Sequence, residues 1–291
     1  MPSNTIQWFP GHMAKTRRLI QENLPKVDIL IEVLDARIPY SSRNPEIHRI
    51  ADKKPLLTLL NKAGLASPEV NDAWLADFKK SGEHACLTDC VNGDGIQKIP
   101  DIMREILSEK VERYREKGME GRRLRAMIVG IPNVGKSSLI NRMCRSGKTK
   151  VENRPGVTLS KQWVSTELGI DLMDMPGVLW PKFDDQIVGE NLAFTGAIKD
   201  NILDIEELAM ILCARLNQNY PNLLAARYKL NTDEIRDLDG YDLLALIGKR
   251  RGMLVAGGET DFRRAANMLL DEFRHATIGR ISLERPNDRK V

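Results

Sequence analysis

The chain has 291 residues, enough for one large domain or two of ordinary size. Charged residues make up 29% and hydrophobic residues 42%, a composition typical of folded globular proteins that excludes a disordered chain. The net charge of +4 is too small to identify a nucleic-acid binder, and no apolar run reaches the ~20 residues of a membrane span, so we expect no membrane partner.

Residues 1–25 form a basic and aromatic segment before the first predicted strand. The segment lacks the apolar core of a secretory signal peptide, which favours a cytoplasmic protein. Its aromatic and basic side chains suit stacking on RNA bases together with contacts to phosphates. A helix that docks its aromatic rings against a sheet explains the same residues. These side chains are Trp8, Phe9, His12, Lys15, Arg17 and Arg18.

Three apolar runs, at 27–36, 55–61 and 84–91, have strand character. A helix is predicted over 67–82, between the second and third runs, and another over 95–117, with a nearly all-charged second half. Strands that alternate with helices predict a parallel sheet.

A second group of elements surrounds "GIPNVGKS" at 130–137. An apolar strand at 124–129 precedes this segment and a helix at 138–144 follows it. Two more strands are expected at 161–168 and 170–177.

Beyond residue 180, apolar residues recur at intervals of three and four, without a convincing strand. This pattern predicts a separate, smaller all-helical domain over 181–291. The expected fold is therefore an α/β P-loop domain at 26–180, with a mostly parallel sheet flanked by helices, followed by the helical domain.

The segment 130–137 matches Gly-x4-Gly-Lys-Ser in a strand–loop–helix context, which is specific for a phosphate-binding loop. Its glycines let backbone N–H groups face phosphate oxygens, Lys136 neutralises the β- and γ-phosphates, and Ser137 can ligate Mg²⁺. The residues predicted to bind nucleotide here are Asn133, Val134, Gly135, Lys136, Ser137 and Ser138.

Two downstream segments match the switch layout of a GTPase. "RPGVT" (154–158) offers Thr158 as a Mg²⁺ ligand. "DMPG" (174–177) offers Asp174, which would reach Mg²⁺ through water, and the Gly177 N–H for the γ-phosphate. Each segment is weak evidence alone, but in this order after a phosphate loop they predict that the protein senses the γ-phosphate.

The segment "NKAG" (61–64) comes close to Asn-Lys-x-Asp, the sequence with which many nucleotide-binding proteins read guanine. It departs from that sequence in two ways. Gly64 stands in the Asp position, and the segment precedes the phosphate loop, whereas most such proteins carry it afterwards.

The chain resembles, over nearly its whole length, the circularly permuted GTPases of the ribosome biogenesis GTPase A type. In that family the base-reading segments precede the phosphate loop because the GTPase fold has been cut and rejoined. The resemblance implies GTP and Mg²⁺ as ligands, and it makes "TDCVNG" (88–93), with Asp89 and Cys90, the second base-binding loop. The segments that carry it are "IQWFPGHMAK", "VLDARIPYSSRNPEI", "NKAG", "GIPNVGKSSLIN", "RPGVT", "DMPGVLWPK" and "TGAIKD".

Gly64 is a departure from the usual guanine pocket. There an Asp carboxylate accepts from guanine N1–H and from the exocyclic amine, which Gly64 cannot do. Asn61 and Lys62 remain able to contact the base edge and to pack along it. We therefore predict GTP binding with relaxed or weaker guanine selectivity.

Val178 follows Gly177, where many GTPases place a Gln that orients the attacking water. We therefore expect slow hydrolysis by the isolated protein, with Lys136 and Thr158 as catalytic residues. The resemblance implies two further contributors, His12 approaching the γ-phosphate when a partner is bound and Asn133 holding a K⁺ ion. The alternatives are that His12 contacts RNA or caps its helix, and that Asn133 only supports the turn of the loop.

By resemblance, the partner is the large ribosomal subunit precursor, with its rRNA and ribosomal proteins, which stimulates hydrolysis by a monomeric protein. A regulatory switch that binds a protein partner rather than rRNA is the chief alternative. A metabolic kinase-like enzyme is a third, disfavoured by the switch motifs. Five basic residues make the helical domain a candidate contact: Lys249, Arg250, Arg251, Arg263 and Arg264.

Overall fold

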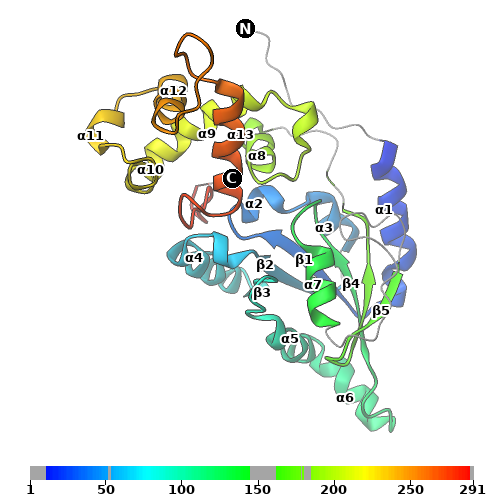
Figure 1. Ribbon diagram of the computed structural model, residues 1–291. Coiled ribbons are helices and arrows are strands. Elements are labelled where there is room, and N and C mark those ends of the chain that lie inside the picture. Colours follow the sequence, from blue (N-terminus) through cyan, green and yellow to red (C-terminus); the bar gives the residue numbers. More distant parts are fainter. Residues whose placement is uncertain (1–10, 52–53, 145–161, 178, 180–184, 289–291) are drawn as a thin grey trace. The chain divides into compact units, whose positions relative to one another are not determined.

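The computed structural model describes residues 11–51, 54–144, 162–177, 179 and 185–288 (Figure 1). Its contacts divide the chain into two compact units. Unit 1 comprises Met1–Gln186 together with Ser282–Val291, and unit 2 comprises Ile187–Ile281. The domain boundaries at residues 25 and 180 remain predictions.

Unit 1 is built on a six-stranded sheet with the strand order β3-β2-β1-β4-β6-β5 (Figure 1). Neighbouring strands are parallel except for the antiparallel pair β5–β6. The predicted α/β fold, with a mostly parallel sheet, is therefore confirmed. The strands are β1 Ile29–Asp35, β2 Leu56–Asn61, β3 His84–Leu87, β4 Leu124–Val129, β5 Gln162–Ser165 and β6 Ile170–Asp174.

The strand order brings the two halves of the sequence together at the carboxyl ends of the parallel strands. The chain starts at β1, runs outward to β2 and β3, and then returns to place β4 on the other side of β1. Asp35 lies opposite Asn61, and Ile128 lies opposite Asp174. Because parallel strands end at the same edge, the loops after β1, β2, β4 and β6 converge there, which is where open α/β sheets bind ligands.

Helices cover both faces of this sheet (Figure 1). Leu30 packs in a core cluster with Ile20 of α1 and Ile47 of α3, whereas Leu34 packs with Val70 and Trp74 of α4. Leu30 and Leu34 are an even number of residues apart on β1, so α1, α3 and α4 cover the same face. The helices of unit 1 are α1 Gly11–Asn23, α2 Pro39–Ser42, α3 Pro45–Ala51, α4 Pro68–Lys80, α5 Ile99–Ile106, α6 Ser108–Glu116 and α7 Lys136–Met143.

The helix predicted over 95–117 is two helices, α5 and α6, preceded by a 3-10 turn at Ile96–Lys98. The break falls at Leu107, whose φ of −100° and ψ of 21° leave the helical range. Leu107 is buried, and its N–H still bonds the Met103 carbonyl, which closes the last turn of α5. The charged second half of the predicted helix forms α6, which has no fully buried residue.

Unit 2 is helical, and within residues 187–281 the structure shows no strand beyond an isolated bridge between Leu254 and Thr260. Its centre is α9, whose Leu212 and Leu216 are fully buried, as are Ile247 of α12 and Leu269 of α13. The predicted helical character of this segment is confirmed. The helices of this part are α8 Gln186–Phe194, α9 Ile205–Asn219, α10 Pro221–Tyr228, α11 Thr232–Ile235, α12 Gly240–Arg250 and α13 Phe262–Arg274.

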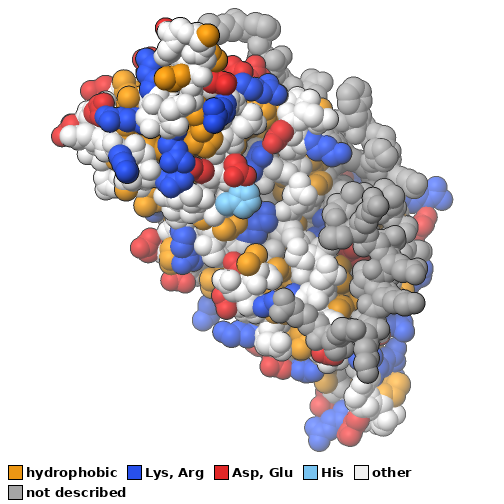
Figure 2. Space-filling view, viewed as in Figure 1, with side chains coloured by type: hydrophobic (Ala, Val, Ile, Leu, Met, Phe, Trp, Pro, Cys, Tyr) orange, Lys and Arg blue, Asp and Glu red, His pale blue; other side chains and the backbone are white. Residues whose placement is uncertain are grey.

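Acidic partners neutralise part of the basic charge of unit 2. Glu272 pairs with Arg227 and Arg251 and accepts from the Tyr228 hydroxyl, and Arg250 lies 3.9 Å from Glu234. Figure 2 accordingly shows Lys and Arg interspersed with Asp and Glu rather than one continuous basic surface.

The segment after Ser282 returns to unit 1. Leu283 N–H donates to the Arg37 carbonyl (2.8 Å), and the Glu284 carboxylate accepts from the N–H groups of Tyr40 and Ser41 (2.8 and 3.1 Å). The Trp74 indole N–H donates to the Glu284 carbonyl (3.2 Å). Unit 2 is thus joined covalently to unit 1 at both of its ends.

Among the described residues, no helix has the length and apolar character to cross a membrane.

Candidate functional site

The loop between β4 and α7 has the backbone of a phosphate cradle. Three residues of the loop have positive φ values: Gly130 (+150°), Asn133 (+61°) and Gly135 (+97°). The backbone therefore curves sharply between β4 and α7. A Cβ on Gly130 would lie 2.5 Å from the Val33 carbonyl oxygen, and one on Gly135 would lie 2.3 Å from Asn61 Nδ2. Both positions therefore require glycine, and the loop ends at the N-terminus of α7, where N–H groups favour an anion.

Lys136 is folded back into this cradle. Its Nζ donates to the carbonyls of Gly130 (3.1 Å) and Ile131 (2.8 Å), and the residue is 8% exposed. Burial lowers the pKa of Lys136 to about 8, although the nearby Asp174 carboxylate opposes the shift. A buried cation of this kind is stabilised by any anion placed beside it.

The segment after β6 lies directly against the phosphate loop. A Cβ on Gly177 would approach both Lys136 Nζ and Pro132 N at 2.9 Å. Asp174, at the end of β6, is 9% exposed and close enough to Lys136 to affect its pKa. The predicted switch residues Asp174 and Gly177 are thus brought to the phosphate loop.

Asn61 connects the end of β2 to both neighbouring loops. Its Nδ2 donates to the Val134 carbonyl (2.7 Å), and its Oδ1 accepts from the Thr88 hydroxyl and the Cys90 thiol, both at 3.2 Å. Burial and the Asp89 charge raise the pKa of Cys90 to about 11, so the thiol keeps the proton that it donates. Asn61 therefore ties the phosphate loop to the second base loop.

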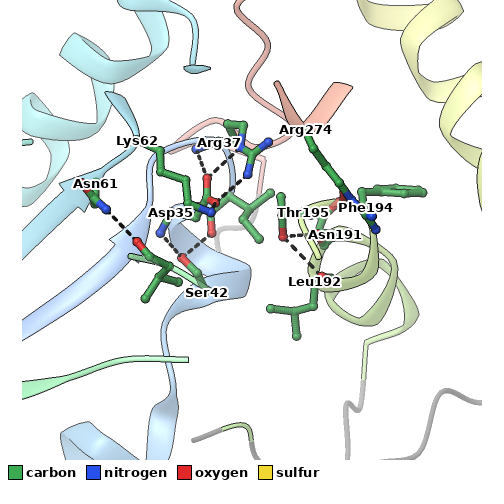
Figure 3. A network of polar contacts seen from close by, with 12 residues as sticks. Asp35, Arg37, Ser42, Asn61, Lys62, Asn191, Leu192, Phe194, Thr195 and Arg274 are labelled. Carbon is green, nitrogen blue, oxygen red and sulfur yellow. Dashed lines mark hydrogen bonds and ion pairs between the residues drawn. The ribbon is translucent and has the colours of Figure 1, made fainter. Parts of the chain in front are cut away.

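Lys62 is held by the carboxylate at the end of β1 (Figure 3). Its Nζ lies 3.0 Å from Asp35 Oδ2, and the same carboxylate pairs with the guanidinium of Arg37. Burial disfavours ionisation of Asp35, but Arg37 and Lys62 outweigh it and hold the pKa of Asp35 well below its ordinary value. Lys62 itself has a φ of +60°, which is uncommon for a non-glycine residue.

The two base-side loops meet at Gly64 and Asp89. The Gly64 N–H donates to Asp89 Oδ2 (3.0 Å), and Asp89 Oδ1 accepts from the N–H groups of Val91 and Asn92 (2.8 and 3.3 Å). Asp89 is 5% exposed. The predicted base-side residues of the loops after β2 and β3 thus lie close together.

Comparison with known proteins agrees with this geometry. The protein named ribosome biogenesis GTPase A of Bacillus licheniformis is 46% identical over 97% of this chain and 99% of its own length. The chain belongs to the ribosome biogenesis GTPase A family. The protein of that name from Priestia megaterium is 47% identical over 98% of both chains. The resemblance inferred from the motifs is confirmed, and this member of the family is a GTPase that binds GTP.

Two further comparisons extend the relationship. Residues 125–238 match the family described as 50S ribosome-binding GTPase. The crystal structure described as GNP-bound YlqF from T. maritima covers 94% of this chain and 100% of its own, at 25% identity and a TM-score of 0.63. That structure supports the permuted GTPase fold of the ribosome biogenesis GTPase A family.

The structure does not describe the side chains of three residues expected in the site. Thr158 and Val178 are outside the described residues, and His12 is described only as part of the α1 backbone. Ser137 lies half-buried in the first turn of α7, whereas Ser138 and Asn133 are exposed. The roles of these residues in a ribosome biogenesis GTPase A remain predictions.

No local sequence pattern indicates the role of Asp35 and Arg37. Asp35 ends β1 and pairs with Arg37, and it also positions Lys62, a predicted base contact. Lys62 follows β2 and Asp35 ends β1, so the pair could be found only from the register that sets Asp35 beside Asn61. The same holds for the contact of Arg142 Nη2 with the Asn92 carbonyl (2.6 Å), which ties α7 to the second base loop.

Proposed function

We propose that this GTPase acts as a nucleotide-dependent switch in assembly of the large ribosomal subunit, with hydrolysis stimulated by the ribosomal partner. The main support for a switch is that Gly177 lies close to Lys136 and Pro132, so that the residues directly after β6 face the phosphate cradle. The match to the 50S ribosome-binding GTPase family and the names of the relatives support the ribosomal partner.

The residues present suit a Mg²⁺–nucleotide complex. Mg²⁺ is usually held by one or two protein oxygens together with phosphates and water, and the site offers the Ser137 hydroxyl and the Asp174 carboxylate. We assign Ser137 and Thr158 as direct ligands and Asp174 as a ligand through water, while Mg²⁺ would neutralise phosphate charge.

Hydrolysis needs a group that orients water, and Val178 has none in its side chain. We assign this role to His12 when the ribosomal partner is bound, and a K⁺ site to Asn133. The positive φ of Asn133 directs its backbone into the curve of the phosphate loop, which supports a place beside the phosphates. On this account the isolated protein hydrolyses GTP slowly.

The chain connectivity supports transmission of the nucleotide state. Gly177 is separated from α8, which begins at Gln186, only by residues 178–185. A γ-phosphate that orders the segment after Asp174 would therefore act on the chain that enters unit 2. We propose that unit 2 contributes to ribosome binding, with local basic groups rather than a general polyanion-binding surface (Figure 2).

Co-sedimentation with isolated ribosomal subunits tests this proposal. We expect the protein, a cytoplasmic monomer on this account, to sediment with the large subunit, more with a non-hydrolysable GTP analogue than with GDP. Lys136→Ala, as the control, should lose the nucleotide dependence. Sedimentation with neither subunit under either condition would favour the alternative, a switch that binds a protein partner.

A further inference from the structure

Gly64 leaves the guanine site without the carboxylate that the position normally supplies. The chain nevertheless binds GTP, and the Watson–Crick edge of guanine carries two donors that adenine lacks, N1–H and the 2-amino group. A pocket that selects guanine through these donors needs an acceptor for them. The acceptor must therefore come from another residue.

The Asp89 carboxylate occupies the space of the missing side chain. An ideal Cβ on Gly64 would lie 2.5 Å from Asp89 Oδ2. Within an aspartate, covalent geometry separates Cβ from its own carboxylate oxygens by about 2.4 Å. Asp89 Oδ2 thus lies at the distance from residue 64 at which an aspartate there would hold its own oxygen.

This carboxylate is held in place by the backbone of its own site. Three backbone N–H groups, those of Gly64, Val91 and Asn92, hold its two oxygens, and the Asp89 N–H donates to the Asp94 carbonyl (3.0 Å). Arg142 anchors the same loop to α7 through the Asn92 carbonyl. A charged acceptor that is held in place binds its donors with little loss of conformational entropy.

Asp89 also retains acceptor capacity. A carboxylate offers about four acceptor positions, and contacts within the described part of the chain use three of them. The contact with Asn92 N, at 3.3 Å, is long for an N–H···O bond and can be exchanged for a stronger one. One vacant position and one exchangeable contact match the two donors of guanine.

We propose that Asp89, from the loop after β3, reads guanine in place of residue 64, and that Gly64 is the space that admits its carboxylate. The proposal rests on the GTP binding of the family and not on the ribosomal role. It replaces the expectation of relaxed selectivity with one of guanine selectivity through a relocated carboxylate. Adenine would place a ring acceptor and a C–H group against Asp89 and would be rejected.

The test compares nucleotide affinities of Asp89→Ser, Asp94→Ser and the double variant Gly64→Asp/Asp89→Ser, each with Mg²⁺. The serine hydroxyl can still accept from a backbone N–H of the local turn, so Asp89→Ser removes the carboxylate while keeping part of the support that the loop receives from residue 89. We expect Asp89→Ser to bind GTP about 10- to 100-fold more weakly than the parent, as expected for a lost charged hydrogen bond, with ATP affinity unchanged. Asp94 is exposed in the same loop, so Asp94→Ser should match the parent. The double variant should recover GTP affinity, because its carboxylate returns to residue 64.

If Asp89→Ser fails to fold, the affinity of the parent protein for inosine triphosphate tests the proposal. Inosine triphosphate lacks only the 2-amino group, so the parent should bind it about 10-fold more weakly than GTP. The proposal is overturned if the parent binds the two nucleotides equally, or if Asp89→Ser keeps the parent's preference for GTP over ATP. Loss of all nucleotides together in Asp89→Ser, without recovery in the double variant, also overturns it, since that outcome assigns Asp89 to loop structure alone.

Discussion

The side-chain amide of Asn61 donates a hydrogen bond of 2.7 Å to the carbonyl oxygen of Val134. This bond joins a residue at the end of β2 to the middle of the phosphate loop, so the base side and the phosphate side of the site share one buried side chain. The permuted order of the sequence does not separate them, because β2 and β4 both neighbour β1.

Asn61→Ala should weaken the binding of both GTP and GDP. The substitution leaves the Val134 carbonyl, the Thr88 hydroxyl and the Cys90 thiol without this partner, at a cost of about 1–3 kcal/mol to the organised site. Calorimetric titration should show about 10-fold weaker binding of both nucleotides. Asn267→Ala, which removes an exposed amide that donates to the Arg263 carbonyl of its own helix, is the control and should change neither affinity.

The pKa of about 8 at Lys136 predicts a pH dependence of GTP affinity. Below pH 8 the ammonium is present and binds phosphate, whereas above pH 8 binding must first take up a proton. The affinity should therefore be flat at neutral pH and fall as pH rises from 8 toward 10, with proton uptake on binding in that window. Lys136→Arg, which stays charged, should show no such fall. An equally flat profile for the parent would contradict the buried position of Lys136.

The lowered pKa of Lys136 also affects the stability of the nucleotide-free protein. The contribution of Lys136 to this stability should rise with pH, whereas the affinity for GTP should fall. Lys136 is deprotonated near pH 8 when folded but keeps its proton to 10.5 when unfolded. The unfolded state therefore binds more protons between these values, and the contribution of Lys136 to the free energy of unfolding should rise with pH across that window. Urea unfolding of the parent and Lys136→Met at pH 8 and pH 10 measures the difference, which should shrink or vanish in the variant.

Asp35→Asn should destabilise unit 1. Arg37 is 1% exposed, and the substitution removes the negative charge that pairs with its buried guanidinium, which typically reduces the free energy of unfolding by about 3–5 kcal/mol. Because the folded pKa of Asp35 lies well below its unfolded value of 3.8, the stabilisation is complete above pH 5 and is lost only in strong acid. Asp101→Asn, which breaks an exposed pair with Arg104, should cost less than about 1 kcal/mol in the same urea titration.

Glu284→Gln should loosen the return of the chain to unit 1. The carboxylate is buried and accepts from two N–H groups of α2, so the neutral amide should reduce the free energy of unfolding by about 1–3 kcal/mol. Hydrogen exchange should show faster exchange of the Tyr40 and Ser41 amides. Glu259→Gln, at an exposed position of unit 2, should leave both amides protected as in the parent. Unchanged protection in Glu284→Gln would mean that these bonds do not hold the segment.

The parts of the fold and site that the sequence predicts are those with local patterns. The strand, glycine-rich loop and helix around Lys136 are contiguous, so their chemistry can be recognised without knowing the rest of the fold. The parallel sheet likewise follows from strands that alternate with helices. The helical character of unit 2 follows from its apolar periodicity.

The remaining features depend on tertiary register, which no local pattern carries. The contact of Lys62 with Asp35 and that of Gly64 with Asp89 join residues on different strands or loops. The return of Glu284 to α2 spans most of the chain, and a lone glutamate near the end gives no indication of it. The break at Leu107 interrupts a segment whose composition favours one helix.

The most direct test of the nucleotide site is the affinity of Lys136→Ala for GTP, measured by calorimetry with Mg²⁺ beside the parent and an exposed control, Lys80→Ala. A buried cation at the phosphate cradle predicts that Lys136→Ala binds GTP at least about 100-fold more weakly, while Lys80→Ala matches the parent. Equal affinity of Lys136→Ala and the parent would contradict the assignment of residues 130–137 as the phosphate-binding loop.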